Sequence, residues 1–430
     1  MGKDGIYAGL GFSDEQNPLQ AAKQAATESV RGIKDPKLAI VFTSVHYGGN
    51  NLKKILGEIK KIVKAPVVGC TGAAILTPEV TSPHGIGIMT LAGQMDVGIG
   101  VGKKSRMHPI ESGRQAAKAA LENLGKSGYK NRCALIFPSG MKFPDLPGMK
   151  AMMKMGVSKL MFPALSKFMA LKGTGPARYE EVLEGAALGT NKSMPIIGAG
   201  AFDDFKGKRN FQFLNEEVYQ DSVVFAVISS DASIKISYKH GLKPTGKKME
   251  ITKAKGSLAF EINNKPAWQG FKELYEIPPE LEDKWKSNPV AMTISEVPAD
   301  RDENGKYWIA APLCVIGDAI LFARNVEEKT LHICRGTGEQ ILQAAKDVAV
   351  DATTGITPSF GLVFSPVPRV MTMMEKIDVE RRYIKDVFNS TPFFGLYCCA
   401  AEVFLPAEKG KNAELLKCLN ETIAIITFGK

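Results

Sequence analysis

The chain has 430 residues, of which 44% are hydrophobic and 23% are charged. This length indicates two or three domains, and the composition excludes a disordered or fibrous protein. The net charge is +10, and residues 141–173, with six lysines and one aspartate, supply half of it. The basic charge outside that segment forms no stripe, so the composition does not favour a nucleic-acid-binding protein.

No stretch of the sequence has the character of a membrane span. The most apolar runs, at 222–228 and 310–323, are too short or are interrupted by Pro312 and Asp318. Residues 1–20 lack the basic start and apolar run of a signal peptide, so we expect a cytoplasmic protein. The seven cysteines include no CxxC pair, which argues against a disulfide framework or a zinc ribbon and favours free thiols.

A phrase of proline, two apolar residues and glycine occurs three times, at 66–69, 195–198 and 392–395. The patterns around each copy follow the same order of strand, helix, strand, helix and strand. Recurrence of this kind is typical of a repeated structural module. The sequence therefore predicts an α/β fold in which three such modules form mixed sheets covered by helices.

The first two modules are predicted to form an N-terminal domain of residues 1–230. Pro18 and Pro109 each occupy the first turn of a predicted helix, where the missing amide costs nothing. A methionine- and lysine-rich insert at 141–173 lengthens the second module. In chain order, the strands and helices are predicted at 6–10, 18–30, 38–42, 85–91, 97–101, 109–124, 134–137 and 222–229.

Residues 231–430 are predicted to form a C-terminal domain. Residues 231–329 match neither of the first two modules, and their alternating runs between turn clusters indicate an antiparallel, β-rich insert. The third module is predicted at 330–430, with Thr337 as the N-cap of its first helix. Its first three elements and its last strand are predicted at 331–334, 339–350, 361–364 and 422–428.

Small residues follow each repeated apolar strand, in the loops after Gly69, Gly198 and Gly395. Such residues let a ligand approach the backbone, and they equally allow tight packing between modules. Cys70 lies in the first of these loops. We expect either a ligand-binding role or a packing role for these positions.

Acidic residues close two of the three loops, namely Asp203 in the second and Glu402 in the third. In a polar ligand pocket these carboxylates would pair with a cationic group, and a nearby arginine would pair with an anionic group. Arg369, shortly after a predicted strand, is the leading arginine candidate, ahead of Arg324 and Arg335.

Other reactive side chains permit further interpretations. Cys70 and the pair at 398–399 occupy corresponding loops, so a redox pair or a soft-metal site competes with buried, inert thiols. His46 and His84 border the first module's strands and are the candidate ligands if a haem is present, although a loop histidine is the simpler interpretation. No established catalytic or metal-binding motif occurs, so we assign no catalytic residue and no metal ligand.

The insert at 141–173 contains seven of the chain's 17 methionines and reads as two short amphipathic helices. Methionine-rich surfaces adapt to varied partners, and basic amphipathic helices can lie on membranes. Because Pro144, Pro147 and Pro163 interrupt the helical pattern, we favour a lid or a partner surface over a membrane surface.

Several segments together resemble the FIST sensory family. The sequence VVGCT at 67–71 is similar to the family's Gly-Cys-Ser/Thr loop, and residues 195–203 are similar to its Pro-apolar-Gly-Gly loop that ends in an acid. The sequence FSPVPR at 364–369 resembles a Phe-Ser-Cys-x-x-Arg signature. Residues 394–402 and 420–422 resemble the family's C-terminal motifs. Three positions depart from the family pattern, with Pro366, Ala401 and Ala74 where a cysteine, a glycine and an acid are expected.

The resemblance implies that residues 1–230 are a FIST N-terminal domain and residues 231–430 a FIST C-terminal domain. It further implies a sensor for a small, amino-acid-like molecule that signals to a separate partner protein, and some family members are haem proteins that sense nitric oxide. A haem-based sensor, a protein-interaction scaffold and a thiol-dependent enzyme therefore stay open as alternatives. The sequence leaves the cofactor and the oligomeric state undetermined.

Overall fold

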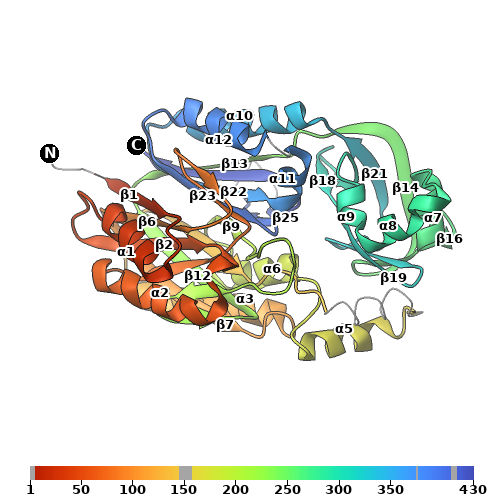
Figure 1. Cartoon of the computed structure of the whole chain (residues 1–430), viewed down its shortest axis with the longest axis horizontal. Helices are drawn as coiled ribbons and strands as arrows, with labels where there is room; N and C mark the ends of the chain where they lie inside the picture. The colour runs from red at the N-terminus through yellow and green to blue at the C-terminus, as the bar shows by residue number, and fades with distance from the viewer. Residues whose placement is uncertain (1–4, 145–156, 374–375, 408–413) are drawn as a thin grey trace.

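The computed structural model describes residues 5–144, 157–373, 376–407 and 414–430. Within these ranges the chain forms three six-stranded mixed sheets, each backed by helices, and an eight-stranded sheet at one end of the molecule (Figure 1). The predicted α/β class with mixed, helix-covered sheets is confirmed. In the described part of the chain, no helix combines the length and apolarity needed to cross a membrane.

The first sheet contains the first module. Across the sheet, the strands are β1 (Ile6–Ser13), β6 (Ile86–Gly93), β2 (Pro36–Thr43), β3 (Val67–Thr71), β10 (Gln212–Leu214) and β11 (Glu217–Tyr219). The helices α1 (Pro18–Ser29) and α2 (Gly49–Ile62) cover its outer face. The predicted start at Pro18 is confirmed, and Asn17 caps the helix by accepting the backbone amides of Leu19 at 3.0 Å and Gln20 at 3.2 Å.

The second sheet contains the second module. Across the sheet, the strands are β7 (Met95–Lys103), β12 (Ser222–Ser230), β8 (Asn131–Pro138), β9 (Ile196–Ala199), β24 (Ala401–Leu405) and β25 (Leu415–Leu419). The helices α3 (Pro109–Leu124) and α6 (Tyr179–Gly189) pack against each other and cover its outer face. As predicted, α3 begins at Pro109.

The third sheet contains the third module. Across the sheet, the strands are β13 (Ser233–Lys239), β26 (Ile423–Gly429), β22 (Pro358–Pro366), β23 (Phe393–Cys398), β4 (Ala74–Leu76) and β5 (Thr81–Ser82). Its helices are α10 (Gly338–Thr353), α11 (Val367–Met373) and α12 (Ile377–Phe388). The predicted cap at Thr337 is confirmed as a capping box, in which Thr337 and Gln340 each accept the other's backbone amide.

The prediction that a strand at 331–334 opens the third module is wrong. That segment forms β21 (Thr330–Arg335), which belongs to the eight-stranded sheet. The opening strand is instead β13, which pairs with β26 as β1 pairs with β6 and β7 with β12. The sequence pattern misled because the eight-stranded sheet is inserted between β13 and α10, so the strand next to the helix in sequence is not its neighbour in the module.

The three six-stranded sheets exchange strands in a cycle. After β3 the chain enters the third sheet as β4, after β9 it enters the first sheet as β10, and after β23 it enters the second sheet as β24. This common order is consistent with the three predicted modules. Because each sheet is completed by a strand from another module, the loops that make these crossings are brought together.

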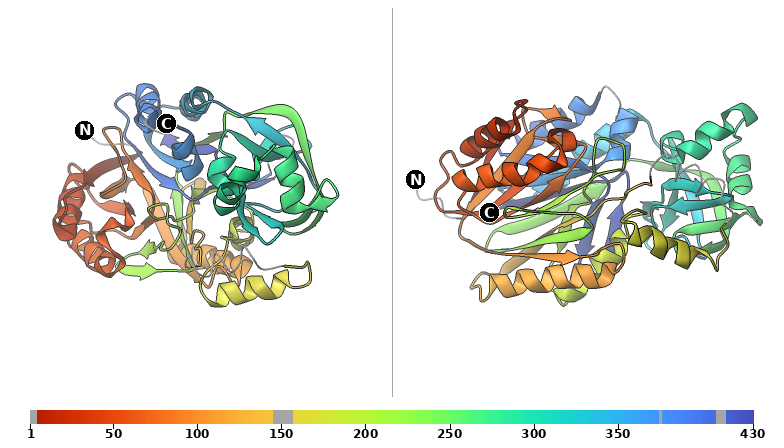
Figure 2. Two further views of the ribbon diagram at one scale, coloured as in Figure 1. Left: turned by 45° about the vertical axis from the view of Figure 1, so that its right-hand side comes forward. Right: turned by 60° about the horizontal axis from the view of Figure 1, so that its bottom comes forward.

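The eight-stranded sheet is antiparallel throughout its described pairings, as the alternating pattern of the insert predicted. Its strands, apart from β21, are β14 (Lys243–Lys255), β15 (Leu258–Ile262), β16 (Lys265–Pro266), β17 (Glu296–Arg301), β18 (Tyr307–Ile309), β19 (Pro312–Ile316) and β20 (Ala319–Phe322). Register shifts along β14 bend the sheet on itself, and we call it the curled sheet. The short helices beside it are α7 (Ala267–Leu274), α8 (Glu282–Ser287) and α9 (Pro289–Met292). Figure 2 shows the curled sheet at one end of the molecule from two further sides.

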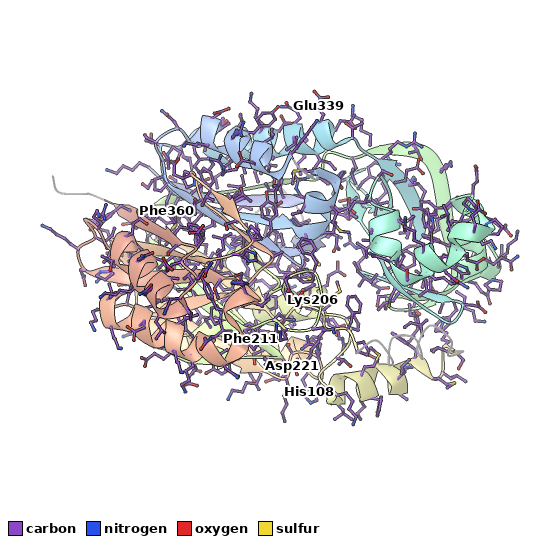
Figure 3. The ribbon with its side chains drawn as sticks, viewed as in Figure 1. His108, Lys206, Phe211, Asp221, Glu339 and Phe360 are labelled. Carbon is purple, nitrogen blue, oxygen red and sulfur yellow. The ribbon has the colours of Figure 1, made fainter. Side chains whose placement is uncertain are left out.

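The inner faces of the three six-stranded sheets meet in one apolar core. Equivalent phenylalanines of β2, β8 and β22 pack edge to face there, with the ring centroids of Phe42 and Phe137 5.7 Å apart and that of Phe364 6.4 Å from each. Phe360 is likewise fully buried, whereas Glu339 projects from the outer surface of α10 (Figure 3). The centre of the molecule is thus filled by side chains and leaves ligand sites to its edges.

One of the two helices predicted in the insert is described, namely α5 (Phe162–Leu171). The other prediction falls on residues that the structure does not describe. No residue of α5 is buried, and Phe168 and Leu171 are 58% and 67% exposed. The helix lies beside the curled sheet (Figure 1).

Candidate functional site

The three repeated loops meet at one end of the central core. Backbone hydrogen bonds join the second loop to the first, from Phe202 N to Thr71 O at 2.9 Å, and the second to the third, from Cys399 N to Gly200 O at 3.0 Å. The first and third loops are joined by Ala73 N to Tyr397 O at 2.8 Å. The cyclic strand exchange therefore places residues from all three modules around one point.

The three glycines serve packing at this junction. A Cβ atom at Gly69 would lie 1.8 Å from Val41 O, and one at Gly198 would lie 1.8 Å from Ile136 O. At Gly395, a Cβ atom would lie 2.7 Å from the carbonyl oxygen of Val363 on β22. Each glycine thus permits close approach of the two parallel strands of its module, the packing role considered from the sequence.

The guanidinium group of Arg369 forms its ion pair and hydrogen bonds within the protein. Its side chain is fully buried on α11 and forms an ion pair with Glu380 of α12, which is also fully buried. Arg369 Nε donates to Ser365 Oγ at 3.2 Å, and Nη2 donates to the carbonyl oxygen of Ile341 at 3.0 Å. Glu380 also accepts the Tyr397 hydroxyl at 2.6 Å. This network ties α10, α11 and α12 to the sheet and uses the charge of Arg369 within the protein.

Asp203 also has internal partners. Its carboxylate accepts the backbone amides of Gly207 at 2.8 Å, Lys208 at 2.7 Å and Arg209 at 3.1 Å. The side chain is nearly fully buried and holds the turn that leads into β10. The structure therefore gives Asp203 a loop-stabilising role.

Glu402 differs from Asp203 and Arg369 because its carboxyl group has no hydrogen-bond partner among the residues that the structure describes. On β24 it lies opposite Gly198 on one side and Cys418 on the other, and its side chain is fully buried. Neither Oε1 nor Oε2 forms a hydrogen bond with any described residue. Burial, reinforced by the charge of Glu180, raises the pKa of Glu402 well above its usual range. An unpartnered buried carboxyl is costly for a fold, and such groups concentrate at functional sites.

A small cavity lies within electrostatic reach of Glu402, which is not one of its lining residues, and we call it the Glu402 cavity. Its volume is about 20 Å³, which is about the space of one water molecule, and Tyr179, Cys399 and Asn420 supply its polar side chains. Burial raises the pKa of Cys399 to about 11 and that of Tyr179 well above its usual range, and the charge of Glu402 adds to both effects. The remaining lining residues are Met141, Ala177, Leu313 and Ala323.

The cavity is bordered by an ion pair between the curled sheet and the second module that the sequence did not predict. Arg324 follows Ala323 of the cavity lining, is only 4% exposed, and donates from Nη2 to Glu180 Oε1 at 2.8 Å. Its other terminal nitrogen, Nη1, is buried and has no hydrogen-bond partner among the described residues. The charges of Arg324 and Glu402 both act on the thiol of Cys418. The donor Nη1 of Arg324 and the carboxyl oxygens of Glu402, which have no partners among the described residues, therefore both lie near Cys418.

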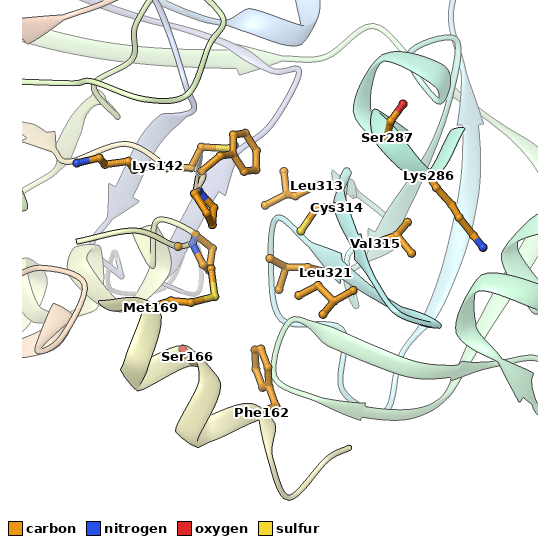
Figure 4. A pocket seen from close by; sticks show the side chains of 16 residues that line it. Lys142, Phe162, Ser166, Met169, Lys286, Ser287, Leu313, Cys314, Val315 and Leu321 are labelled. Atoms are coloured by element: carbon orange, nitrogen blue, oxygen red, sulfur yellow. The ribbon is translucent and has the colours of Figure 1, made fainter. Parts of the chain in front are cut away.

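An apolar cleft adjoins the cavity and shares Met141 and Leu313 with it. One wall is the curled sheet, which contributes Val315 and Leu321, and the other includes Phe162 and Met169 of the α5 segment (Figure 4). The cleft is narrow, with a volume of about 40 Å³. Together, the cleft and the cavity combine apolar walls with a few polar groups, which is the lining composition of a small-molecule site, at volumes far below the roughly 300–1,000 Å³ of such sites.

The remaining candidates lie apart from this arrangement or are inert. Burial raises the pKa of the Cys70 and Cys398 thiols far above the range of reactive cysteines, and Cys398 lies within electrostatic reach of Cys70. His46 and His84 are neighbours, with ring centroids 4.4 Å apart, and both are exposed. Neither histidine borders the Glu402 cavity or the adjoining cleft.

Of the cavity's polar residues, Tyr179 gave no signal in the sequence, and Asn420 stood out only as part of the segment 420–422 that resembles a family motif. Tyr179 opens a short helix after the insert, and Asn420 follows the last exchanged strand, so neither stands near the repeated glycine phrase. Arg324 was recognisable only as a basic residue directly after the apolar run at 310–323. What brings these residues to Glu402 is the strand exchange together with the packing of the curled sheet against the second and third modules.

Family models identify the chain's relatives. The FIST N domain model matches residues 37–265, and the FIST C domain model matches residues 270–402. The chain belongs to the FIST family, whose domains are sensory domains that bind small ligands.

The similarity to individual proteins is more distant. The chain is 36% identical over 95 residues to an uncharacterized protein of Methanocaldococcus jannaschii, a match that spans 22% of this chain and 18% of that protein.

Two solved structures resemble the chain weakly. A cyanuric acid hydrolase from A. caulinodans aligns over 99% of this chain and all of its own, at 7% identity and a TM-score of 0.37. PurLQS from Thermotoga maritima aligns over all of this chain and 75% of its own, at 11% identity and a TM-score of 0.20. At these scores neither likeness supports a statement about activity.

Proposed function

We propose that this protein is a small-molecule sensor whose ligand enters the apolar cleft and places a polar group beside Glu402. The observation that carries the proposal is the fully buried carboxyl group of Glu402, whose two oxygens form no hydrogen bond with any residue that the structure describes. A carboxyl group in this state lowers the stability of the fold, because it has lost its hydration and gained no hydrogen bond. A ligand that donates to it would recover that cost.

The charges around the cavity indicate the class of ligand. A cationic group, such as an ammonium, would pair with Glu402, and an anionic group, such as a carboxylate, would accept from Nη1 of Arg324. A small zwitterion of the amino-acid type carries both groups. Its side chain would lie along the apolar cleft, which accounts for the methionine, leucine and phenylalanine side chains that line it.

The size of the cavity couples ligand binding to movement. About 20 Å³ accommodates about one water molecule, so an amino acid fits only if the walls separate. The walls come from the second module, the third module and the curled sheet, with α5 alongside. Binding would therefore move the curled sheet or α5 relative to the body, and we propose that a separate partner protein detects this change.

A thermal-shift titration with amino acids and their separate parts tests this function. The compounds are the twenty amino acids, simple alkylamines and simple carboxylates, each at millimolar concentration. The variant is Glu402→Gln, which has the shape of the protonated acid and cannot become a carboxylate. The matched control is Glu421→Gln, because Glu421 is also buried with an Oε2 that has no partner among the described residues, but its charge acts on Tyr275 and Cys334 and not on the cavity residues.

We expect at least one amino acid to raise the melting temperature of the wild-type protein and of Glu421→Gln. The same compound should have little effect on Glu402→Gln, and its amine or carboxylate part alone should bind more weakly than the whole. A stabilising amino acid that acts equally on Glu402→Gln would contradict this assignment of the site.

A further inference from the structure

A groove lies on the opposite side of β25 from Glu402 and the Glu402 cavity. Along a strand, neighbouring side chains point to opposite faces, so Lys417 faces away from Cys418, which lies in the electrostatic field of Glu402. The groove has a volume of about 850 Å³, which is within the range of small-molecule pockets. Its walls come from the start of β8, from β13, from β25 and from the hairpin of β17 and β18.

One wall of the groove is aromatic. The rings of Tyr238 on β13 and Trp308 on β18 are 5.8 Å apart between centroids, and Trp308 Nε1 donates to Asp302 Oδ2 at 2.8 Å, which fixes the indole. The apolar side chains of Ile234, Ile236, Leu405 and Leu415 continue this wall. A flat ring could rest here with little loss of protein side-chain freedom.

Cations exceed the available anions in the groove. Lys306 lies 6.0 Å from the Tyr238 ring centroid and Lys417 lies 5.3 Å from that of Trp308, and neither forms an ion pair in the described part of the chain. Lys130, Lys235 and Arg132 add three further positive charges.

The groove's lining includes three acidic residues, two of which form hydrogen bonds or an ion pair. Asp302 holds the Trp308 indole and the backbone amides of Asn304 and Lys306, and Glu414 pairs with Lys192 at 2.9 Å. These hydrogen bonds leave the negative charge of Asp302 in place, where it acts on Lys417, so the described lining of the groove holds five cations against three acids.

We propose that this groove is a second ligand site, which binds a small molecule carrying two or more negative charges beside a flat ring. The ring would pack against Tyr238, and the charges would pair with Lys417 and Lys306. Lys417 is half-buried and forms no direct ion pair with a described residue, and burial lowers its pKa, so an anion at this point would stabilise its charged form. A phosphate ester and an aromatic polycarboxylate share the chemistry that the groove recognises.

Isothermal titration calorimetry at low ionic strength tests the proposal with four probes. AMP and benzene-1,3,5-tricarboxylate carry both a ring and multiple charges, adenosine carries a ring alone, and pyrophosphate carries charge alone. The variants are Lys417→Met, which fills the same volume without charge, and Lys306→Met, which changes an exposed side chain and leaves the fold intact. Lys253→Met, an exposed lysine of the curled sheet outside the groove, is the control.

We expect a ring-bearing anion to bind more tightly than adenosine or pyrophosphate, with about a tenfold weaker affinity in Lys417→Met and in Lys306→Met. Affinity should fall with added salt and stay unchanged in Lys253→Met. The preference between AMP and the tricarboxylate distinguishes the two sources of charge. Absence of millimolar binding by both ring-bearing anions, or wild-type affinity in both groove variants, would overturn the proposal. Because Glu402→Gln leaves the groove intact, it should bind these probes normally, which separates this site from the sensor cavity.

Discussion

Arg324, two residues after the end of β20 in the curled sheet, donates through Nη2 to Glu180 of α6 at 2.8 Å. The arginine is buried, and the side chain of Glu180 is 27% exposed. This ion pair fastens the curled sheet to the second module directly beside the Glu402 cavity. Within the described part of the chain it leaves Nη1 of Arg324 without a partner, so the contact beside the site also offers a donor to a ligand.

The stability of the protein should increase when Glu402 is replaced by glutamine. Burial raises the pKa of Glu402, so the native state keeps the carboxyl proton at pH values where the unfolded chain has already released it. The free energy of unfolding therefore falls as the pH rises above the ordinary pKa of glutamate. Glutamine does not titrate, and it removes this loss. Urea unfolding from pH 4 to pH 8 measures the effect, and a wild-type profile that rises across this range relative to Glu402→Gln would contradict it.

Glu421 should contribute a pH dependence of the same sign. Burial raises its pKa from 4.5 to about 8, although the charge of Arg369 opposes the increase. The unfolded chain ionises from about pH 4.5 upward while the native state keeps its proton to about pH 8. The loss of stability over this interval is on the order of 3–5 kcal/mol and should be absent in Glu421→Gln. Equal slopes of unfolding free energy against pH in the two proteins would refute this assignment.

Breaking the buried pair of Arg369 and Glu380 should destabilise the third module strongly. Glu380→Gln leaves the guanidinium buried without its counter-ion, and loss of one partner from such a pair costs about 3–5 kcal/mol. Glu339→Gln, an exposed acid on α10, provides the control and should change stability by less than about 0.5 kcal/mol. Chemical denaturation measures both, and similar midpoints for the two variants would argue against the structural role of Arg369.

Ligand binding should change the reactivity of Cys314. This residue lines the apolar cleft and is the one cysteine of the seven that is partly exposed, whereas the other six are buried. Burial of its thiol raises the pKa to about 12, so alkylation should be slow in the ligand-free protein. A ligand in the cleft should alter the rate by at least severalfold, as followed by intact-protein mass spectrometry, with Cys314→Ser as the control. An unchanged rate in the presence of a stabilising amino acid would place that ligand outside the cleft.

The sequence patterns predicted the layers of the fold better than their connections. Pro18, Pro109 and Thr337 begin their helices as expected, because caps and first-turn prolines are determined locally. The opening strand of the third module was misplaced because the curled sheet separates β13 from α10 along the chain. Strand exchange between sheets depends on packing between modules, which a local pattern does not record.

The same contrast between local pattern and packing applies to the predicted site residues. Glu402 was singled out because it closes a repeated loop, and it is the predicted residue that the structure leaves unpartnered. Arg369 looked equally suitable in the sequence, but its buried partner Glu380 lies on a separate helix. Tyr179 and Arg324 join the site from distant segments, so only the folded structure shows that they belong to it.

The most direct test of the central claim is native mass spectrometry of the wild-type protein and of Glu402→Gln, after each has been incubated with the same extract of small metabolites and exchanged into volatile buffer. The account predicts that the wild-type protein retains a small molecule bearing an amine and that Glu402→Gln does not. Retention of the same molecule by both proteins, or retention by the wild type only of molecules that lack a cationic group, would contradict it.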